Sequence, residues 1–264
     1  MRLLLALALL IPTLAQAQDR RPSHCIALAE ADPALNYVHR ANWQEPLPAN
    51  TVRLTYVDHA MFLLQTEGGL NVITDYVGFT GGITLIPDVV TMNHAHSSHW
   101  TANPDPAIPH VLKGWQSDHH LDLGEMLVRN VPTDIRSRTG GTPEVDGNSI
   151  FVFEVAGLCI GHLGHLHHEP DAAQYAALGR LDIVMAPVDG GMTLDLPTMT
   201  RVLKRLKSSV VIPMHWWGRY SLNAFLKGMK DEFDVVEPDS AFIEISARSL
   251  PKKPDDHGAE TVLL

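Results

Sequence analysis

Eight of the fifteen histidines of this chain fall in three short segments, and this clustering is the strongest chemical signal in the sequence. Residues 94–99 read His-Ala-His-Ser-Ser-His, residues 162–168 read His-Leu-Gly-His-Leu-His-His, and the third segment contributes His215. Imidazole binds zinc well, and it also binds copper, nickel and iron. Histidines grouped in this way predict a metal site, whereas a merely histidine-rich surface that collects metal nonspecifically is the weaker interpretation.

Each histidine segment follows a short apolar run that is typical of a buried strand. These runs cover residues 89–92, 158–161 and 210–214. Loops that leave the ends of strands commonly carry functional residues. If the three strand ends lie side by side, their imidazoles converge on one point.

The rest of the chain predicts strands first and then an alternation of strands and helices. Expected strands cover 51–56, 61–65, 70–74, 89–92, 126–131, 149–155, 158–161, 183–186 and 210–213. Expected helices cover a short patch at 26–37, then 171–178 and 196–206. This order indicates two sheets covered by helices.

The composition predicts a globular protein, and a basic start, an apolar run over 3–11 and the small-x-small signature at 15–17 predict export. The 264 residues are 45% hydrophobic with a net charge of −10, which excludes a mainly disordered chain and argues against a nucleic-acid partner. We predict a cleaved signal peptide at 1–17, an extension at 18–50, one domain at 51–248 and a tail at 249–264. A periplasmic or secreted location without a membrane anchor is expected.

Two cysteines could form one bridge in an oxidising compartment, but the sequence does not favour it. Cys159 lies in an apolar run, where a small buried side chain is the simpler interpretation. Cys25 is expected to be structurally minor.

Four motifs, in their order along the chain, resemble those of the metallo-β-lactamase superfamily. Residues 93–99 are similar to its HxHxDH signature, 160–165 to its HxGD turn, 186–191 to its PVGG turn and 212–215 to its IPMH turn. The combination is similar to the branch that contains L-ascorbate-6-phosphate lactonase and related hydrolases. The resemblance covers residues 59–216 and implies a single α/β (α+β) domain, the four-layer αββα sandwich, with metal-dependent hydrolysis as its activity.

The metal motif departs from the family pattern at two carboxylate positions. Ser98 stands where the family has an aspartate, His165 replaces the aspartate that bridges two metals, and no histidine near 131–134 completes the family's first metal site. A neutral imidazole has one free lone pair and cannot bridge two ions. We therefore predict one ion per chain, zinc by preference or another divalent transition metal, with ligands drawn from His94, His96, His99, His165 and His215.

The resemblance also implies groups that support these ligands. Asp75 stands where the family has an acid behind its ligands, and His59 where relatives have a histidine near the site, although an ordinary turn aspartate and a core histidine are the simpler interpretations. Asp189 is a further expected partner of the ligands. Candidates for proton transfer are His162, His168, Asp58 and Asp189, with Ser98 able to orient a water.

An all-imidazole site leaves the charge of the ion uncompensated, which lowers the pKa of bound water to about 7. We therefore expect a metal-bound hydroxide that attacks a small ester, lactone, amide or phosphoester. The alternative is a non-catalytic periplasmic protein that binds or handles metal on the same fold. An oxidoreductase is less favoured, because no G-x-G-x-x-G motif follows a strand. The substrate and the oligomeric state stay open.

Overall fold

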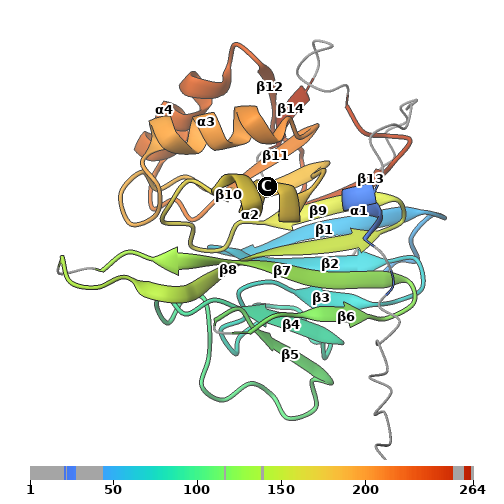
Figure 1. Cartoon of the computed structure of the whole chain (residues 1–264). Coiled ribbons are helices and arrows are strands. Elements are labelled where there is room, and N and C mark those ends of the chain that lie inside the picture. The colour runs from blue at the N-terminus through green and yellow to red at the C-terminus, as the bar shows by residue number, and fades with distance from the viewer. Residues whose placement is uncertain are drawn as a thin grey trace, which may run out of the picture.

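The computed structural model describes residues 21, 23–27, 44–115, 117–137, 140–251 and 259–262. Two mixed β-sheets pack face to face, and the longer helices cover one of them (Figure 1). The predicted signal peptide, 1–17, and most of the helical patch expected at 26–37 lie outside the described residues. Within those residues, no helix is long and apolar enough to span a membrane.

The first sheet has six strands in the order β13-β1-β2-β3-β4-β5. Its strands are β1 (Thr51–Asp58), β2 (Met61–Thr66), β3 (Asn71–Ile73), β4 (Val89–Met92), β5 (His110–Lys113) and β13 (Phe242–Ser246). The pairs from β13 to β3 are antiparallel, and β3-β4 and β4-β5 are parallel.

The second sheet has eight strands in the order β12-β14-β11-β10-β9-β8-β7-β6. Its strands are β6 (His120–Asp122), β7 (Met126–Ile135), β8 (Glu144–Val155), β9 (Leu158–His162), β10 (Ile183–Pro187), β11 (Val210–Met214), β12 (Phe233–Val236) and β14 (Ala259–Val262). Strands β9, β10 and β11 are parallel neighbours, so their carboxyl ends meet at one edge.

In the described part of the chain, four helices accompany the sheets: α1 (His24–Ala27), α2 (Ala172–Leu178), α3 (Leu196–Leu206) and α4 (Arg219–Met229). Helix α2 begins with a capping box, because the Asp171 side chain accepts from the Gln174 amide while the Gln174 side chain accepts from the Asp171 amide. Helix α3 has Asp195 as its N-cap. The apolar faces of α2, α3 and α4 pack into the core through Leu178, Val202, Leu203 and Phe225.

Three apolar cores follow from this layering. One lies between the helices and the eight-stranded sheet, a second lies between the two sheets, and a third covers the outer face of the six-stranded sheet. Loop side chains such as Ile83, Leu85, Trp100 and Trp115 pack on that third core. In the described part of the chain, loops therefore cover the outer face of the six-stranded sheet, as helices cover the outer face of the eight-stranded sheet.

The expectation about the cysteines was wrong. Cys25 and Cys159 form a disulfide with their Cα atoms 5.8 Å apart. The bridge ties α1 to β9, and Glu154 reinforces it by accepting from the Ser23 hydroxyl and the His24 amide. The sequence could not show this pairing, because the two cysteines are 134 residues apart.

The segment expected to be a tail, 249–264, contributes a strand instead. Strand β14 lies between β12 and β11 and runs parallel to both. An edge strand such as β11 would otherwise present unpaired backbone groups, and β14 satisfies them.

Candidate metal centre

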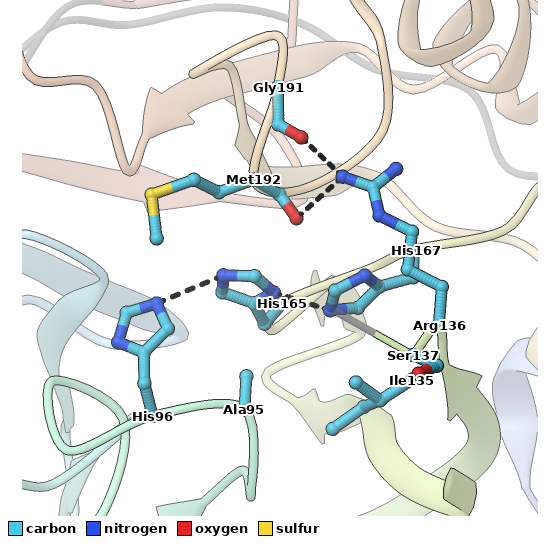
Figure 2. A pocket seen from close by; sticks show the side chains of 9 residues that line it. All are labelled: Ala95, His96, Ile135, Arg136, Ser137, His165, His167, Gly191 and Met192. Carbon is cyan, nitrogen blue, oxygen red and sulfur yellow. Dashed lines mark hydrogen bonds between the residues drawn. The ribbon is translucent and has the colours of Figure 1, made fainter. Parts of the chain in front are cut away.

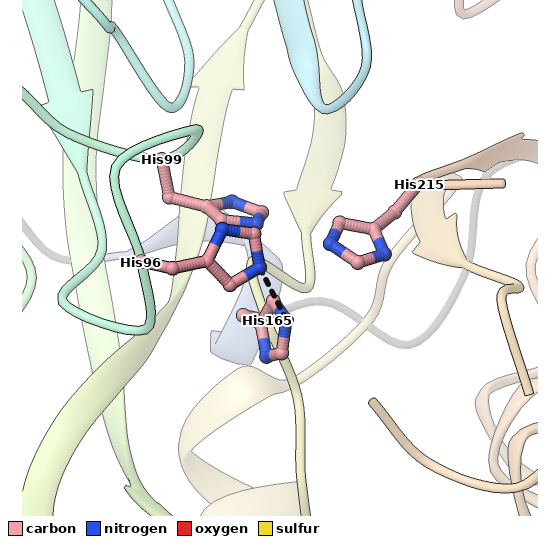
Figure 3. Close-up of side chains that lie close together, drawn as sticks. All are labelled: His96, His99, His165 and His215. Atoms are coloured by element: carbon pink, nitrogen blue, oxygen red, sulfur yellow. Dashed lines mark hydrogen bonds between the residues drawn. The ribbon is translucent and has the colours of Figure 1, made fainter. Parts of the chain in front are cut away.

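Four of the five predicted ligands come together at one point between the two sheets: His96, His99, His165 and His215 (Figure 3). One ring nitrogen from each lies within 4.8 Å of the others. The first two follow β4, the third follows β9 and the fourth follows β11. The strand ends therefore converge as their sequence pattern predicts.

Two of the four imidazoles are held by buried carboxylates. The Nδ1 atom of His99 lies 2.5 Å from Asp75 Oδ2, and Nδ1 of His215 lies 3.0 Å from Asp189 Oδ2. The Nε2 atoms of both histidines are buried and have no hydrogen-bond partner. Each carboxylate thus fixes the tautomer that leaves the Nε2 lone pair free.

The other two imidazoles are held by neutral groups. Nδ1 of His96 lies 2.8 Å from the Ser98 hydroxyl, and Nδ1 of His165 lies 2.7 Å from Nε2 of His167. The Nε2 atoms of His96 and His165 face each other at 3.0 Å. Two lone pairs at that distance repel unless a proton or a cation lies between them.

The donor set fits a tetrahedral zinc ion. Zn–N bonds of about 2.0–2.1 Å place neighbouring nitrogens of a tetrahedron roughly 3.3 Å apart, close to the observed 3.0 Å contact. Two buried Nε2 atoms without a partner are also costly unless a ligand satisfies them. One ion, rather than two, matches the single point on which the four rings converge.

The backbone around the cluster is held in unusual conformations. His215, His59 and Asp75 all have positive φ values, of 54°, 49° and 44°. The His215 amide donates to the His59 carbonyl, which ties the β1–β2 turn to the end of β11. Residues held in the left-handed region cluster at functional sites. Here they orient the ligand His215 and, through Asp75, the ligand His99.

Burial keeps two of the four imidazoles, those of His99 and His165, neutral. It lowers the pKa of His99 and His165 well below 6.5, and the neighbouring imidazoles lower it further. The same two causes lower the pKa of His59 to about 3. Neutral rings have the free lone pairs that a metal ion requires.

The two supporting carboxylates differ in their electrostatics. Burial raises the pKa of Asp75 to about 6, and a nearby cation would lower it again. Burial also raises the pKa of Asp189, but hydrogen bonds from His215 and Thr193 outweigh it and leave that pKa well below its usual value. Asp189 is therefore ionised at neutral pH.

The structure does not bring His94, the fifth predicted ligand, into the cluster. Its Nδ1 lies 2.6 Å from Glu144 Oε1, its ring stacks on Trp115, and its side chain is 38% exposed. Although the motif pairs His94 with His96, the loop after β4 turns the first ring toward β8 and the second toward the cluster.

Two of the predicted proton-transfer groups lie elsewhere. His162 is buried with both ring nitrogens engaged, because Nε2 bonds the Ala60 carbonyl and Nδ1 accepts from the Gly164 amide. His168 is exposed, and its ring lies 6.5 Å from that of His167. His162 therefore has no free ring nitrogen for proton transfer.

His59 lies at the rim of the cluster. Its ring is 4.1 Å from that of His215 and 4.6 Å from that of the exposed Trp217, and its Nε2 is buried without a partner. Asp58, the remaining sequence candidate, is exposed at the end of β1.

A pocket of about 260 Å³ opens beside the cluster (Figure 2). His96 and His165 line one end of it, and Arg136, Ser137 and His167 line the other. Arg136 is not predicted from the sequence as a site residue. No motif marks it, and only the pairing of β7 with β8 brings the end of β7 to the site.

Comparison with known proteins gives concordant findings. Residues 53–215 match the model of the beta-lactamase superfamily domain. A UPF0173 metal-dependent hydrolase of Methanosphaerula palustris is 27% identical over 220 residues, covering 74% of this chain and all of the relative.

Solved structures agree on the fold. A structure from Thermotoga maritima, assigned to the metallo-beta-lactamase superfamily, superposes with a TM-score of 0.59 at 24% identity and covers 80% of this chain and 98% of that one. A metallo hydrolase of Ignicoccus hospitalis gives a TM-score of 0.51 at 18% identity, over 68% of this chain and 91% of that one.

Proposed function

This chain belongs to the beta-lactamase superfamily domain family, and from this membership we propose that it is an exported metal-dependent hydrolase. The observation that carries the proposal is the convergence of four imidazoles whose Nδ1 atoms are each held by another side chain. Relatives named metal-dependent hydrolases support the reaction class.

The ion that the cluster would hold is zinc, one per chain. When bound, zinc polarises a carbonyl or phosphoryl oxygen and lowers the pKa of a coordinated water to about 7. Asp75 and Asp189 would keep two ligand rings in the correct tautomer. The Nε2 of His59, at the rim and without a hydrogen-bond partner, would bond a water or a substrate group that enters beside the ion, whereas both ring nitrogens of His162 are already engaged.

The substrate we propose is a small ester, lactone, amide or phosphoester. The pocket of about 260 Å³ lies below the usual range for drug-sized ligands, roughly 300–1,000 Å³, which favours a small substrate. The acidic net charge of −10 disfavours nucleic acid as substrate.

The proposed location is the periplasm or the cell exterior. The apolar leader at 1–17 motivates this proposal, and the disulfide between Cys25 and Cys159 supports it, because such bridges persist in oxidising compartments. The mass of the mature protein should correspond to cleavage after Ala17.

One observation favours a second function, that of a non-catalytic protein that binds or handles metal. Four imidazoles fill all the positions of tetrahedral zinc, as in structural sites, whereas catalytic sites keep one position for water or substrate. A catalytic role therefore requires a fifth coordination position or the release of the half-buried His96.

The test combines metal content with turnover. The mature protein, purified without a histidine tag, should hold about one zinc per chain and hydrolyse some members of a panel of small esters, lactones and phosphoesters. His96→Ala and His215→Ala should lose the tightly held zinc and about 100-fold or more in turnover. Zinc without turnover of the panel would favour the metal-handling function.

His94→Ala is the matched control, because it alters the same motif outside the cluster. It should retain about one zinc per chain and most of the activity. Full zinc content and activity in both cluster variants would contradict the proposal.

A further inference from the structure

The pocket beside the metal centre joins two chemically different ends (Figure 2). At one end His96 and His165 present the cluster, and at the other Arg136 supplies a positive charge. No carboxylate is among the residues that line this pocket in the described part of the chain. Such a combination favours a ligand with a negative charge at the second end.

Arg136 is held in place but keeps donors free. One terminal nitrogen of its guanidinium donates to the backbone carbonyls of Gly191 and Met192. A guanidinium has five N–H donors in a planar fork. Among the described residues, Arg136 forms no ion pair with a carboxylate, so its charge is not neutralised within the fold.

His167 supplies a second donor, and its tautomer follows from the metal centre. His165 must leave its Nε2 lone pair free for a metal, so its Nδ1 carries the proton and donates to His167 Nε2. The proton of His167 is therefore on Nδ1. That atom is buried without a partner in a side chain that is only 7% exposed.

Figure 2 shows His165, His167 and Arg136 following one another along the pocket, with Met192 on the opposite wall. The charged Arg136 guanidinium and the unpartnered Nδ1 of His167 thus both lie at the end of the pocket away from the cluster. An anionic oxygen would satisfy both and would form the charge-assisted hydrogen bonds that arginine favours.

We propose that Arg136 and His167 form a subsite for an anionic group, a carboxylate or a phosphate, of a small substrate whose scissile bond lies at the histidine cluster. This inference rests on the proposed function for the reaction and adds the substrate class. Arg136 is a specificity-determining residue in this scheme, because it contacts a part of the substrate that does not react.

The first experiment measures binding without turnover. Calorimetry of the zinc-loaded protein with inorganic phosphate and, separately, with succinate should show binding of at least one of the two anions. Arg136→Gln should weaken that binding at least 10-fold, and Arg136→Lys should weaken it less, because the charge remains. The anion that binds more tightly identifies the group as phosphate or carboxylate.

Arg201→Gln is the matched control. Arg201 is 60% exposed on α3 and pairs with Glu169, so its replacement should leave anion binding unchanged. Zinc content of about one per chain in each variant shows that the cluster is intact. If neither anion binds the wild-type protein, or if Arg136→Gln binds as tightly as wild type, the proposal is wrong.

The second experiment compares two esters with one leaving group, 4-nitrophenyl acetate and 4-nitrophenyl hydrogen succinate, on the zinc-loaded protein. Arg136→Gln should raise KM for the charged ester at least 10-fold and for the neutral ester less than 2-fold. Equal effects on the two esters would contradict the subsite. Absence of turnover with either ester counts against the hydrolase, while the binding experiment still decides the subsite.

Discussion

At the scale of single residues, the centre has no carboxylate among its candidate ligands but has two carboxylates hydrogen-bonded behind them. Ser98 and His165 occupy positions where the resemblance implies aspartates. Asp75 and Asp189 nevertheless lie behind His99 and His215, so two negative charges remain close to the proposed dication. They partly balance its charge without coordinating it.

Asp75→Asn should weaken zinc binding by about 10- to 100-fold. An asparagine side chain has one oxygen, and both the Asn93 amide and the His99 Nδ1–H require an acceptor at this position. If the amide NH₂ faces His99, the ring takes the other tautomer and its Nε2 carries a proton. Competition with a zinc chelator measures the effect.

Asp118→Asn provides the comparison, because Asp118 is exposed and distant in sequence from every ligand. Its zinc affinity should equal that of the wild type. Equal affinities in both variants would show that Asp75 does not set the tautomer of His99.

Which residues gather at the site could be predicted only in part. The histidine motifs identify the ligand loops, but they do not show that His94 pairs with Glu144 instead of joining the cluster. That choice depends on the β7–β8 hairpin, which lies far along the chain. Arg136 could not be predicted for the same reason. A single arginine outside any motif does not indicate a binding site until the pairing of β7 with β8 is known.

At the scale of elements, the turn after β9 positions His165. Gly164 has a φ of 59°, and a Cβ atom there would lie 2.4 Å from Asn93 Nδ2 and 2.5 Å from Asn148 Oδ1. The two asparagines hold this turn, because Asn148 Oδ1 accepts from the His165 amide while Asn93 bonds Asp75 and the Ser149 amide. The glycine is therefore required for conformation and for space.

Gly164→Ala should lower both zinc affinity, by about 10-fold or more, and stability, by about 1–3 kcal/mol. The added methyl group must push the asparagines or the backbone, and either movement shifts His165. Zinc titration and urea unfolding of the same variant report the two effects.

Gly191→Ala tests whether this loss is specific. Gly191 also lies in a loop beside the site, but a Cβ atom there meets nothing within 4 Å. This variant should bind zinc and unfold as the wild type does. A Gly164→Ala protein with unchanged zinc affinity would contradict the role given to the turn.

Elements with a clear pattern could be predicted from the sequence, whereas those stabilised by distant partners could not. The bounds expected for β4 and α3 match the structure, because a short apolar run and an amphipathic repeat with a capping aspartate are local signals. Strands β5 and β6 are short and half-buried, and β14 follows a charged segment. Their pairing depends on neighbours far along the chain.

At the scale of the whole molecule, the buried histidines couple stability to pH. In the metal-free protein, burial depresses the pKa of His99 and His165 well below 6.5 and that of His59 and His167 to about 3 and 4. Below pH 6.5 the unfolded chain therefore binds protons at these residues that the folded chain does not bind. Stability is lost as the pH falls through this range.

Asp75 acts in the opposite direction. Burial raises its pKa to about 6, so between pH 4 and pH 6 the folded chain binds a proton there that the unfolded chain has released. This one group stabilises the folded protein as the pH falls, but several histidines oppose it. The net effect of acid is therefore destabilising.

We expect the metal-free protein to lose stability between pH 7 and pH 5. After subtraction of the opposing Asp75 effect, the loss is about 2 kcal/mol if only the fully buried His99 and His165 contribute. It is about 6 kcal/mol if His59 and His167 each contribute as much as they do. Because a domain has only about 5–15 kcal/mol in total, the metal-free fold should be marginal at pH 5. Urea unfolding in a chelator at pH 5, 6 and 7 measures this loss.

His165→Gln in the same chelator is the internal comparison. Glutamine does not titrate, so the variant should show a flatter dependence on pH, by about 2 kcal/mol over the same interval. A wild-type stability that stays constant or rises toward pH 5 would show that the cluster takes up protons without cost. Bound zinc should oppose the loss near pH 7 and be released as acid protonates its ligands, because protons and the metal compete for the same lone pairs.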